Sequence, residues 1–153
     1  MSMLETQLAE AKSHANDNEQ YVGKYNLRFV GLNEEDDEDC REKVISLCKD
    51  TLDIDDIDVK EIDRAHRVGP KKSDKARPII VKFKSYDTKI MISKRKSALK
   101  GSQIYINEDL TKENAKLFNF IRKNCNATVK SMWVTDGKIL VKKNNDGKNT
   151  ARS

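Results

Sequence analysis

Residues 76–83 read ARPIIVKF, and this stretch decides the fold. The apolar run Ile79-Ile80-Val81 and the Lys82-Phe83 pair after it are typical of a strand that is anchored in a hydrophobic core. Positive charge surrounds this strand. Five basic residues lie within it or just upstream: Lys71, Lys72, Lys75, Arg77 and Lys82. We therefore expect the apolar triplet to hold the strand in place, and the flanking charge to face a ligand of opposite charge.

The net charge of +5 conceals a split along the chain. Residues 33–63 carry fourteen acidic and four basic residues, a net charge of −10, whereas residues 64–153 carry twenty-three basic and seven acidic residues, a net charge of +16. Residues 1–32 are nearly neutral, with a net charge of −1. Such a split favours one basic face for a polyanion and an acidic face turned elsewhere. The alternative is charge that only keeps the chain soluble.

Strands and helices alternate around the 76–83 stretch in the order βαββαβ. The predicted strands cover residues 26–32, 59–68, 78–83 and 103–107. The first predicted helix is opened by the acidic run 34–39 and has an apolar stripe of Val44, Leu47, Cys48 and Leu52. The second spans residues 85–99, with Ile90, Met91 and Ala98 facing inward. This order predicts an α+β, ferredoxin-like domain over residues 26–108, with four antiparallel strands and two helices on one face.

Residues 1–25 repeat apolar or small residues at a spacing of three to four. The predicted seam consists of Leu4, Leu8, Ala11, Ala15, Asn18 and Val22. About three heptads of this kind are typical of the end of a coiled coil, which would join copies of the chain. The alternative is a lone surface helix.

Residues 109–144 predict a small domain made of a helix and a hairpin. Thr111 caps the helix, whose apolar stripe is Leu117, Phe118 and Ile121. The strands 129–134 and 138–143 flank Thr135-Asp136-Gly137, and Asp-Gly favours a type I′ turn. Pairing across this turn places Met132, Val134, Ile139 and Val141 on one face, and Trp133, Leu140 and Lys142 on the other. The polar tail 145–153 is expected to be disordered.

The predicted sheet face resembles the RNA-binding face of RNA-recognition motifs (RRMs), with one departure. The usual octamer of the third strand places aromatic residues at two outward positions. Here these positions hold Pro78 and Ile80, and the outward residues of the first strand are Asn26 and Arg28. Tyr105 is the clear outward aromatic residue. Because stacked bases give ordinary RRMs their sequence preference, we expect this face to bind the nucleic-acid backbone and to tolerate sequence.

Segments in a fixed order resemble the first-open-reading-frame protein of LINE-type retrotransposons. They are NLRFVGL (26–32), AHRVG (65–69), RPIIVKF (77–83) and LKGSQIYINEDLT (99–111). The tail, DLTKENAKLFNFIRKN (109–124) and MWVTDGKILVKK (132–143), is also similar to the C-terminal domain of the baculovirus few-polyhedra (FP) protein, which animal LINE proteins share. The family's N-L-R falls on Asn26 to Arg28, and its frequent basic residue of the fourth strand is here Tyr105.

The LINE resemblance implies a homo-oligomer held by a coiled coil, with a trimer favoured. It also implies single-stranded RNA and DNA binding with chaperone activity, in a cytoplasmic ribonucleoprotein with the nucleus as a further location. The alternative is an FP-type viral or host scaffold that acts mainly through protein partners. Contacts to nucleic acid are expected from one set of residues: Asn26, Arg28, Arg64, Arg67, Arg77, Lys82, Lys94, Arg95, Lys96, Lys100, Tyr105, Trp133, Lys138, Lys142 and Lys143. Trp133 is left open between stacking and a place in the core.

Other chemistry finds little support in the sequence. We expect no enzyme, because the chain has no Ser/His/Asp or Cys/His arrangement, no Walker-type loop and no paired carboxylates beside a cleft. The run EEDDED (34–39) is expected to be solvated rather than to hold a metal, and no cofactor is expected. Cys40, Cys48 and Cys125 form no CxxC pair and are expected to be reduced thiols. No stretch approaches the ~20 apolar residues of a membrane span.

Overall fold

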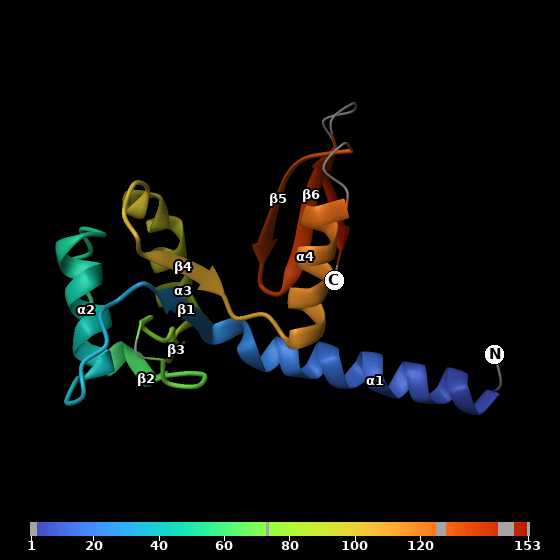
Figure 1. The fold of residues 1–153 in the computed structure, drawn as a ribbon, viewed down its shortest axis with the longest axis horizontal. Helices are drawn as coiled ribbons and strands as arrows, with labels where there is room; N and C mark the ends of the chain where they lie inside the picture. The colour runs from blue at the N-terminus through green and yellow to red at the C-terminus, as the bar shows by residue number, and fades with distance from the viewer. Residues whose placement is uncertain (1–2, 73, 125–127, 144–148, 153) are drawn as a thin grey trace. The chain divides into compact units, whose positions relative to one another are not determined.

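The computed structural model describes residues 3–72, 74–124, 128–143 and 149–152. It is an α+β protein with a long N-terminal helix (Figure 1). The chain divides into two compact units. One unit is Tyr25–Asn107, and the other combines Met1–Lys24 with Glu108–Ser153. The predicted coil end and the C-terminal module therefore lie in the same unit.

The unit Tyr25–Asn107 contains four strands and two α-helices in the predicted order. The strands are β1 (Asn26–Val30), β2 (Ile62–Arg67), β3 (Ile79–Phe83) and β4 (Tyr105–Glu108), and the helices are α2 (Cys40–Asp50) and α3 (Tyr86–Lys94). Three short 3₁₀ helices, η1 (Gly23–Tyr25), η2 (Val59–Glu61) and η3 (Lys96–Leu99), adjoin them. The strands lie in the order β2-β3-β1-β4. The ARPIIVKF stretch thus ends in a central strand, as its apolar run predicts.

One side of this sheet forms the hydrophobic core. In the antiparallel pairing of β1 with β3, Leu27 lies opposite Val81 and Phe29 lies opposite Ile79, and all four side chains are buried. Phe83 follows on the same side of β3. The apolar stripe of α2 and Ile92 of α3 belong to the same cluster, so both helices cover this face of the sheet. The predicted stripe is confirmed for Val44, Leu47 and Cys48 of α2, and Leu52, which follows the end of the helix, is buried as well.

Two helix predictions need correction. The run 34–39 does not open α2 but precedes it, because Asp39 is the N-cap and its carboxylate accepts hydrogen bonds from the N–H groups of Arg41 and Glu42. The second helix ends at Lys94 rather than at 99, and the chain continues as η3. This change of helix type rotates the inward face, so Leu99 is buried and Ala98 is exposed.

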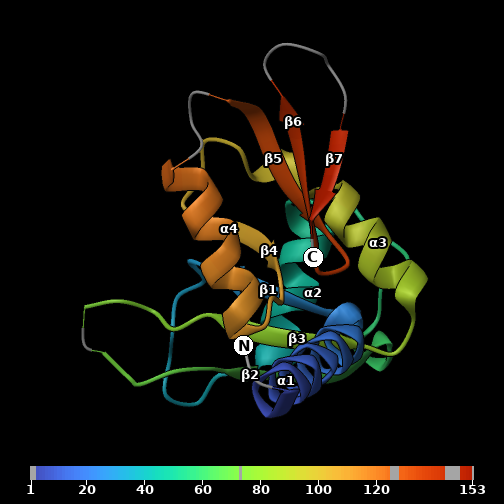
Figure 2. The same ribbon diagram turned by 90° about the vertical axis from the view of Figure 1, so that its right-hand side faces the viewer.

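The other unit contains α1 (Met3–Val22), α4 (Lys112–Asn124) and the strands β5 (Val129–Thr135), β6 (Lys138–Lys143) and β7 (Asn149–Arg152). The three strands lie side by side in the order β5-β6-β7 (Figure 2). Disorder was expected from residue 145 onward, but Asn149–Arg152 pairs with β6 instead. The remaining tail residues, 145–148 and 153, lie outside the described residues.

The β5–β6 hairpin has the predicted turn and register. Asp136 and Gly137 both have positive φ, 52° and 82°, as a type I′ turn requires. Met132 pairs with Val141, and Val134 pairs with Ile139, so these four residues share one face as predicted. The Asp-Gly signal was therefore sufficient to fix which residues of the hairpin face each other.

A buried polar cluster joins the end of α1 to α4 and to the hairpin turn. The Gln20 side-chain oxygen accepts hydrogen bonds from the Thr111 N–H (2.9 Å) and from Asn114 Nδ2 (3.0 Å), and Gln20 Nε2 donates to the Asp109 carbonyl (2.9 Å). Thr111 Oγ1 accepts the Asn114 N–H, which confirms the predicted cap. A Cβ on Gly137 would overlap Gln20 Cγ, so the turn packs directly on this cluster.

The first part of α1 projects its side chains into solvent. Met3, Leu4 and Leu8 are among the most exposed large apolar residues of the described chain, at 80%, 76% and 57%. Ala11, Ala15, Asn18 and Val22 of the predicted seam are exposed as well. No helix among the described residues is both long enough and apolar enough to cross a membrane.

The packing of Gly137 on Gln20 predicts that Gly137→Ala destabilises this unit. The left-handed backbone alone costs a non-glycine residue about 1–3 kcal/mol, and the new Cβ would also displace Gln20. Trp133, the one tryptophan of the chain, lies in β5, so its fluorescence during thermal unfolding reports on this unit.

Gly137→Asn separates the two effects, because asparagine tolerates positive φ better than alanine does but carries the same Cβ. We expect the asparagine variant to unfold well below the wild-type temperature. A wild-type melting temperature for this variant would show that the contact with Gln20 does not constrain the turn.

Candidate nucleic-acid interface

Alternation along the strands separates the core residues from a polar face on the opposite side of the sheet. Because Lys82 lies opposite both Asn26 and Arg64, these three residues form one row across β1, β3 and β2. In the next row, Ile80 lies opposite both Arg28 and His66. We call this side, which is opposite α2 and α3, the open face. It consists of Asn26, Arg28, Arg64, His66, Ile80, Lys82 and the outward residue of β4, Tyr105.

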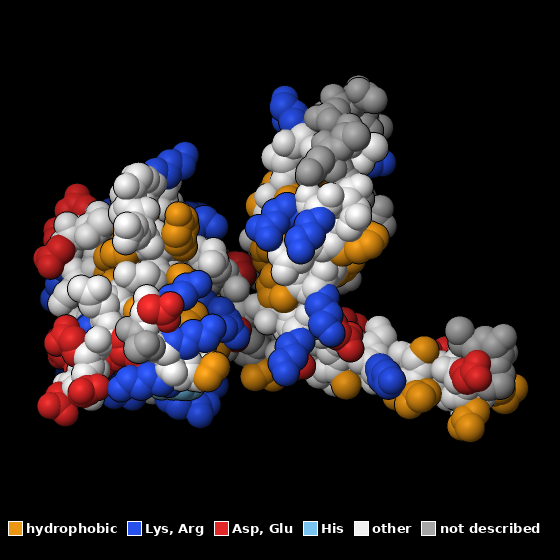
Figure 3. Space-filling model, in the orientation of Figure 1, with side chains coloured by type: hydrophobic (Ala, Val, Ile, Leu, Met, Phe, Trp, Pro, Cys, Tyr) orange, Lys and Arg blue, Asp and Glu red, His pale blue; other side chains and the backbone are white. Residues whose placement is uncertain are grey.

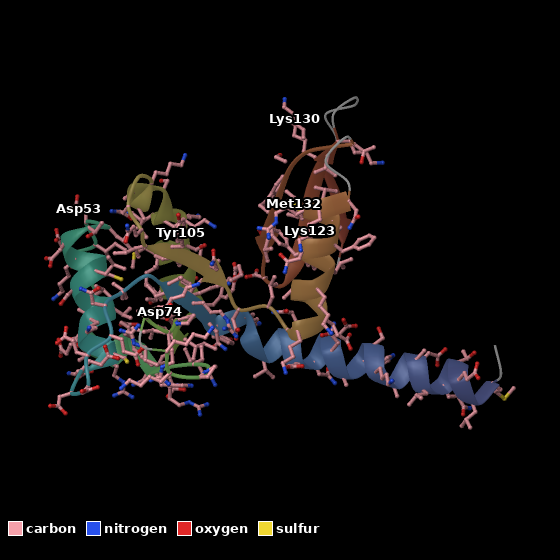
Figure 4. All side chains as sticks on the ribbon, viewed as in Figure 1. Asp53, Asp74, Tyr105, Lys123, Lys130 and Met132 are labelled. Atoms are coloured by element: carbon pink, nitrogen blue, oxygen red, sulfur yellow. The ribbon has the colours of Figure 1, made fainter. Side chains whose placement is uncertain are left out.

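Tyr105 extends the open face at the edge strand β4, which lies next to β1 (Figure 4). The burial of Ile106 turns the preceding Tyr105 to the other side of the strand, where its side chain is 60% exposed. The sequence prediction of one outward aromatic residue on this sheet therefore matches the observed position. His66 and Ile80 also lie on the open face. Ile80 was expected at an outward position, and neither residue is in the predicted set of contacts.

Arg67 was predicted to contact nucleic acid, but it lies on the other side of the sheet from Arg64. It is opposite Ile79, on the core side of the sheet, and its side chain is only 4% exposed. Its guanidinium donates to Glu38 from Nε (2.7 Å) and Nη2 (2.8 Å), and to the Leu32 carbonyl (2.9 Å). This contact holds the pKa of the Glu38 carboxyl well below its usual range. Arg67 therefore fastens the acidic run to β2.

Arg77 is held in a similar way just before β3. Its Nη2 and Nε donate to Glu34 Oε2 at 2.6 and 3.0 Å, and its backbone N–H donates to Glu34 Oε1 at 3.2 Å. The hydrogen bonds from Arg77 lower the pKa of the Glu34 carboxyl. Asp36 adds a third link, an ion pair with Lys71 at 2.9 Å. We therefore place Arg77 outside the open face, as part of an ion-pair clamp that consists of Glu34, Glu38, Arg67 and Arg77.

The basic cluster at the end of α3 divides in two. Arg95 donates from Nη1 to the carbonyls of Leu52 (3.2 Å) and Asp53 (3.0 Å), so it ties the end of α3 to the loop after α2. Lys94, Lys96 and Lys100 are exposed, and their side chains point to solvent. All four residues were expected to contact nucleic acid, whereas its hydrogen bonds give Arg95 a role within the fold.

The predicted contacts of the C-terminal module belong to the other unit. Trp133 pairs with Leu140 across the hairpin, on the face that also carries Lys142. Trp133 is half-buried, so a part of its ring is accessible, while Lys138 and Lys143 are exposed at the two ends of β6. Trp133 and Lys142 thus lie on the same face of the hairpin, as predicted from the sequence.

Acidic and basic side chains lie on different parts of the unit Tyr25–Asn107. In Figure 3, Asp and Glu side chains gather over α2 and its flanking loops, whereas Lys and Arg side chains gather toward the β2 and β3 side. In the ion-pair clamp, Glu38 pairs with Arg67 on the core side of the sheet, and Glu34 pairs with Arg77 just before β3. On the open face Lys82 faces Asp63 at 3.9 Å, the outer limit of an ion pair. The open face therefore keeps a basic character.

Other chemistry is sparse in the part of the chain that the structure describes. No group of three or more His, Cys, Asp or Glu side chains there is arranged to hold a metal ion. Cys40 and Cys48 are free thiols, and burial raises the pKa of the Cys48 thiol to about 12. Cys125 lies outside the described residues.

Comparison with protein families adds one finding. Residues 111–151 match the family described as Baculovirus FP protein domain 2. These residues contain α4 and the hairpin, so the predicted similarity of the C-terminal module to the FP protein is confirmed. A comparison with curated proteins finds no match.

The opposite faces of Arg64 and Arg67 predict opposite effects for two similar variants. Arg67→Ala removes the main partner of the buried Glu38 and leaves it only the ion pair with Lys43 at 3.1 Å. We expect this variant to lower the free energy of unfolding by up to about 3 kcal/mol. Arg64→Ala removes an exposed side chain, so it should leave stability within about 0.5 kcal/mol of the wild type. Denaturant unfolding followed by circular dichroism measures both.

Binding of a fluorescent single-stranded oligonucleotide to the same two proteins completes the comparison. Arg64→Ala should weaken binding about tenfold, the usual scale for a lost charge-assisted hydrogen bond. A folded Arg67→Ala protein should bind like the wild type. If instead Arg67→Ala weakened binding while Arg64→Ala did not, our assignment of the two faces would be wrong.

Proposed function

We propose that this chain binds single-stranded nucleic acid through the open face, as an RRM without the usual aromatic residues. The observation that carries the proposal is the row Asn26–Lys82–Arg64, with Arg28 and Tyr105 on the same face. Guanidinium and ammonium groups suit phosphate oxygens, and an exposed tyrosine suits an unpaired base. One face of one sheet thus presents both kinds of contact.

The topology supports the same proposal. The strand order β2-β3-β1-β4 in a βαββαβ chain, with helices covering one side, agrees with a ferredoxin-like RRM. Such domains bind RNA on the side that the helices leave open. Ile80 and Arg28 occupy the middle of that side here, so Tyr105 and the His66 ring are its aromatic groups and binding depends mainly on charge. Weak discrimination between sequences follows from this composition.

The proposal extends to an oligomeric retrotransposon protein of the LINE first-open-reading-frame type, which coats RNA and acts as a chaperone in a ribonucleoprotein. The exposed leucines and alanines of α1 recur at coiled-coil spacing, which supports self-association. Burying Leu4 and Leu8 between copies would remove apolar surface from water, whereas the isolated helix leaves it exposed. A parallel trimer is the form that the family resemblance favours.

A second function is supported by the match of residues 111–151 to Baculovirus FP protein domain 2. In this alternative the chain is a scaffold, and both α1 and the C-terminal module hold protein partners. Nucleic acid would then bind weakly or not at all, because the basic residues would serve solubility. Binding and self-association therefore need to be measured together.

Sedimentation of the chain with a labelled single-stranded RNA, at two salt concentrations, makes this measurement. We expect complexes with more than one copy of the chain, and an affinity that falls with a log–log salt slope of about 0.7 per phosphate neutralised. A second RNA of the same length and unrelated sequence is the control. Its affinity should agree within a few-fold.

Two results would argue against the proposal. An affinity that does not change with salt would remove the electrostatic mechanism, and a hundredfold preference for one RNA would contradict a face that reads mainly the backbone. Self-association without RNA binding would support the scaffold instead.

A further inference from the structure

A groove of about 400 Å³ lies beside β4, between this strand and the chain that leaves η3. Its walls are mostly apolar, with Leu99, Ile104 and Ile106 among them, and its lining includes Tyr105. Lys96 and Lys100 also line it, and both are exposed. The residues that line the groove therefore include a tyrosine with an exposed side chain, several apolar residues and two exposed lysines, all within one unit of the chain.

Hydrogen bonds fix the wall of this groove. The Ser102 hydroxyl donates to the Leu99 carbonyl (2.7 Å) and accepts the Ile104 N–H (3.2 Å), and the Ser102 N–H also donates to Leu99 (3.0 Å). On the other side, Gly31 lies so close to the Gln103 carbonyl that a Cβ there would overlap it. The loop 99–104 is thus held between a local hydroxyl bridge and the end of β1. A wall fixed in this way loses little freedom when a ligand binds.

We infer that this groove holds a single unpaired nucleotide, with its base against Tyr105 and its phosphate near Lys96 and Lys100. The inference rests on the proposed function and adds to it a specific place for one base. An aromatic side chain suits any base, because every base has a π-face, and lysine suits a phosphate as a point charge. Two lysines at an apolar groove favour an anionic aromatic ligand over a neutral one.

The size of the groove limits what it can hold. Ligand pockets range from about 300 to 1,000 Å³, so this groove is at the small end and suits one nucleotide rather than a stacked run. A paired base cannot enter, because both of its faces are already stacked in the duplex. The groove therefore gives a physical reason for preferring single strands, which the charged residues of the open face alone do not provide.

Three variants test the groove while leaving the remainder of the open face intact. Tyr105→Leu removes the ring and keeps an apolar side chain, Tyr105→Phe keeps the ring, and Lys49→Ala removes an exposed charge of α2 that does not line the groove. With a single-stranded oligonucleotide, Tyr105→Leu should weaken binding about 5- to 150-fold, the range for the loss of one stacked base. Tyr105→Phe and Lys49→Ala should each change binding by less than about threefold.

A direct titration with small probes locates the contact. Adenosine 5′-monophosphate at millimolar concentration should shift the NMR resonances of Tyr105, Lys96 and Lys100, and ribose 5-phosphate, which has no base, should not shift the Tyr105 ring. Equal shifts from both probes would mean that the groove binds phosphate alone and would overturn the inference. An absence of shifts, in a protein that still binds the oligonucleotide with the expected salt dependence, would also overturn it and leave the proposed function standing. If the oligonucleotide failed to bind as well, both would be wrong.

Discussion

The burial of Phe29, Ile79 and Val81 in the middle of the sheet is the constraint on which the rest of the structure depends. All three side chains are fully buried against α2 and α3. Because a strand turns successive residues to opposite sides, burying these three turns Arg28, Ile80 and Lys82 to the other side. A shift of register by one residue would bury Arg28 and Lys82 in the core at a high cost. The same packing that stabilises the fold thus exposes the charges that we assign to binding.

The ion-pair clamp is the second determinant, because it decides which arginines remain accessible. Glu38 and Glu34 engage Arg67 and Arg77, so the strongly acidic run 34–39 is fastened to the sheet instead of being free to compete for the open face. Without the clamp, six adjacent acidic residues next to β1 would repel a polyanion from the same unit. The acidic run and the basic residues lie in separate segments of the sequence. In the structure, two of the acidic residues pair with Arg67 and Arg77 away from the open face, and the basic residues of the open face take no part in these pairs.

Much of the architecture could be predicted from sequence because its signals are local. The Asp-Gly turn, the Thr111 cap and the apolar runs of β1 and β3 each depend on a few adjacent residues. Sequence reasoning missed contacts whose partners are distant in sequence: Arg67 contacts Glu38 across 29 positions, and Arg95 reaches the Leu52 carbonyl across 43. Composition alone counted these arginines as basic surface. Strict alternation would have separated Arg64 from Arg67, but only the structure identifies Glu38 as the partner of Arg67.

The central claim, that the open face binds single-stranded nucleic acid, is tested most directly by comparing two charge-removing variants. Arg28→Ala changes the open face, and Lys49→Ala removes an exposed charge from α2, on the opposite side of the sheet. Affinity for one single-stranded RNA and the melting temperature are measured on the same preparations. We predict that Arg28→Ala weakens binding by about 1.5–3 kcal/mol while Lys49→Ala leaves it nearly unchanged, with little change in melting for either. Equal, small losses for both variants, or unchanged affinity with a lower melting temperature for Arg28→Ala, would contradict the account.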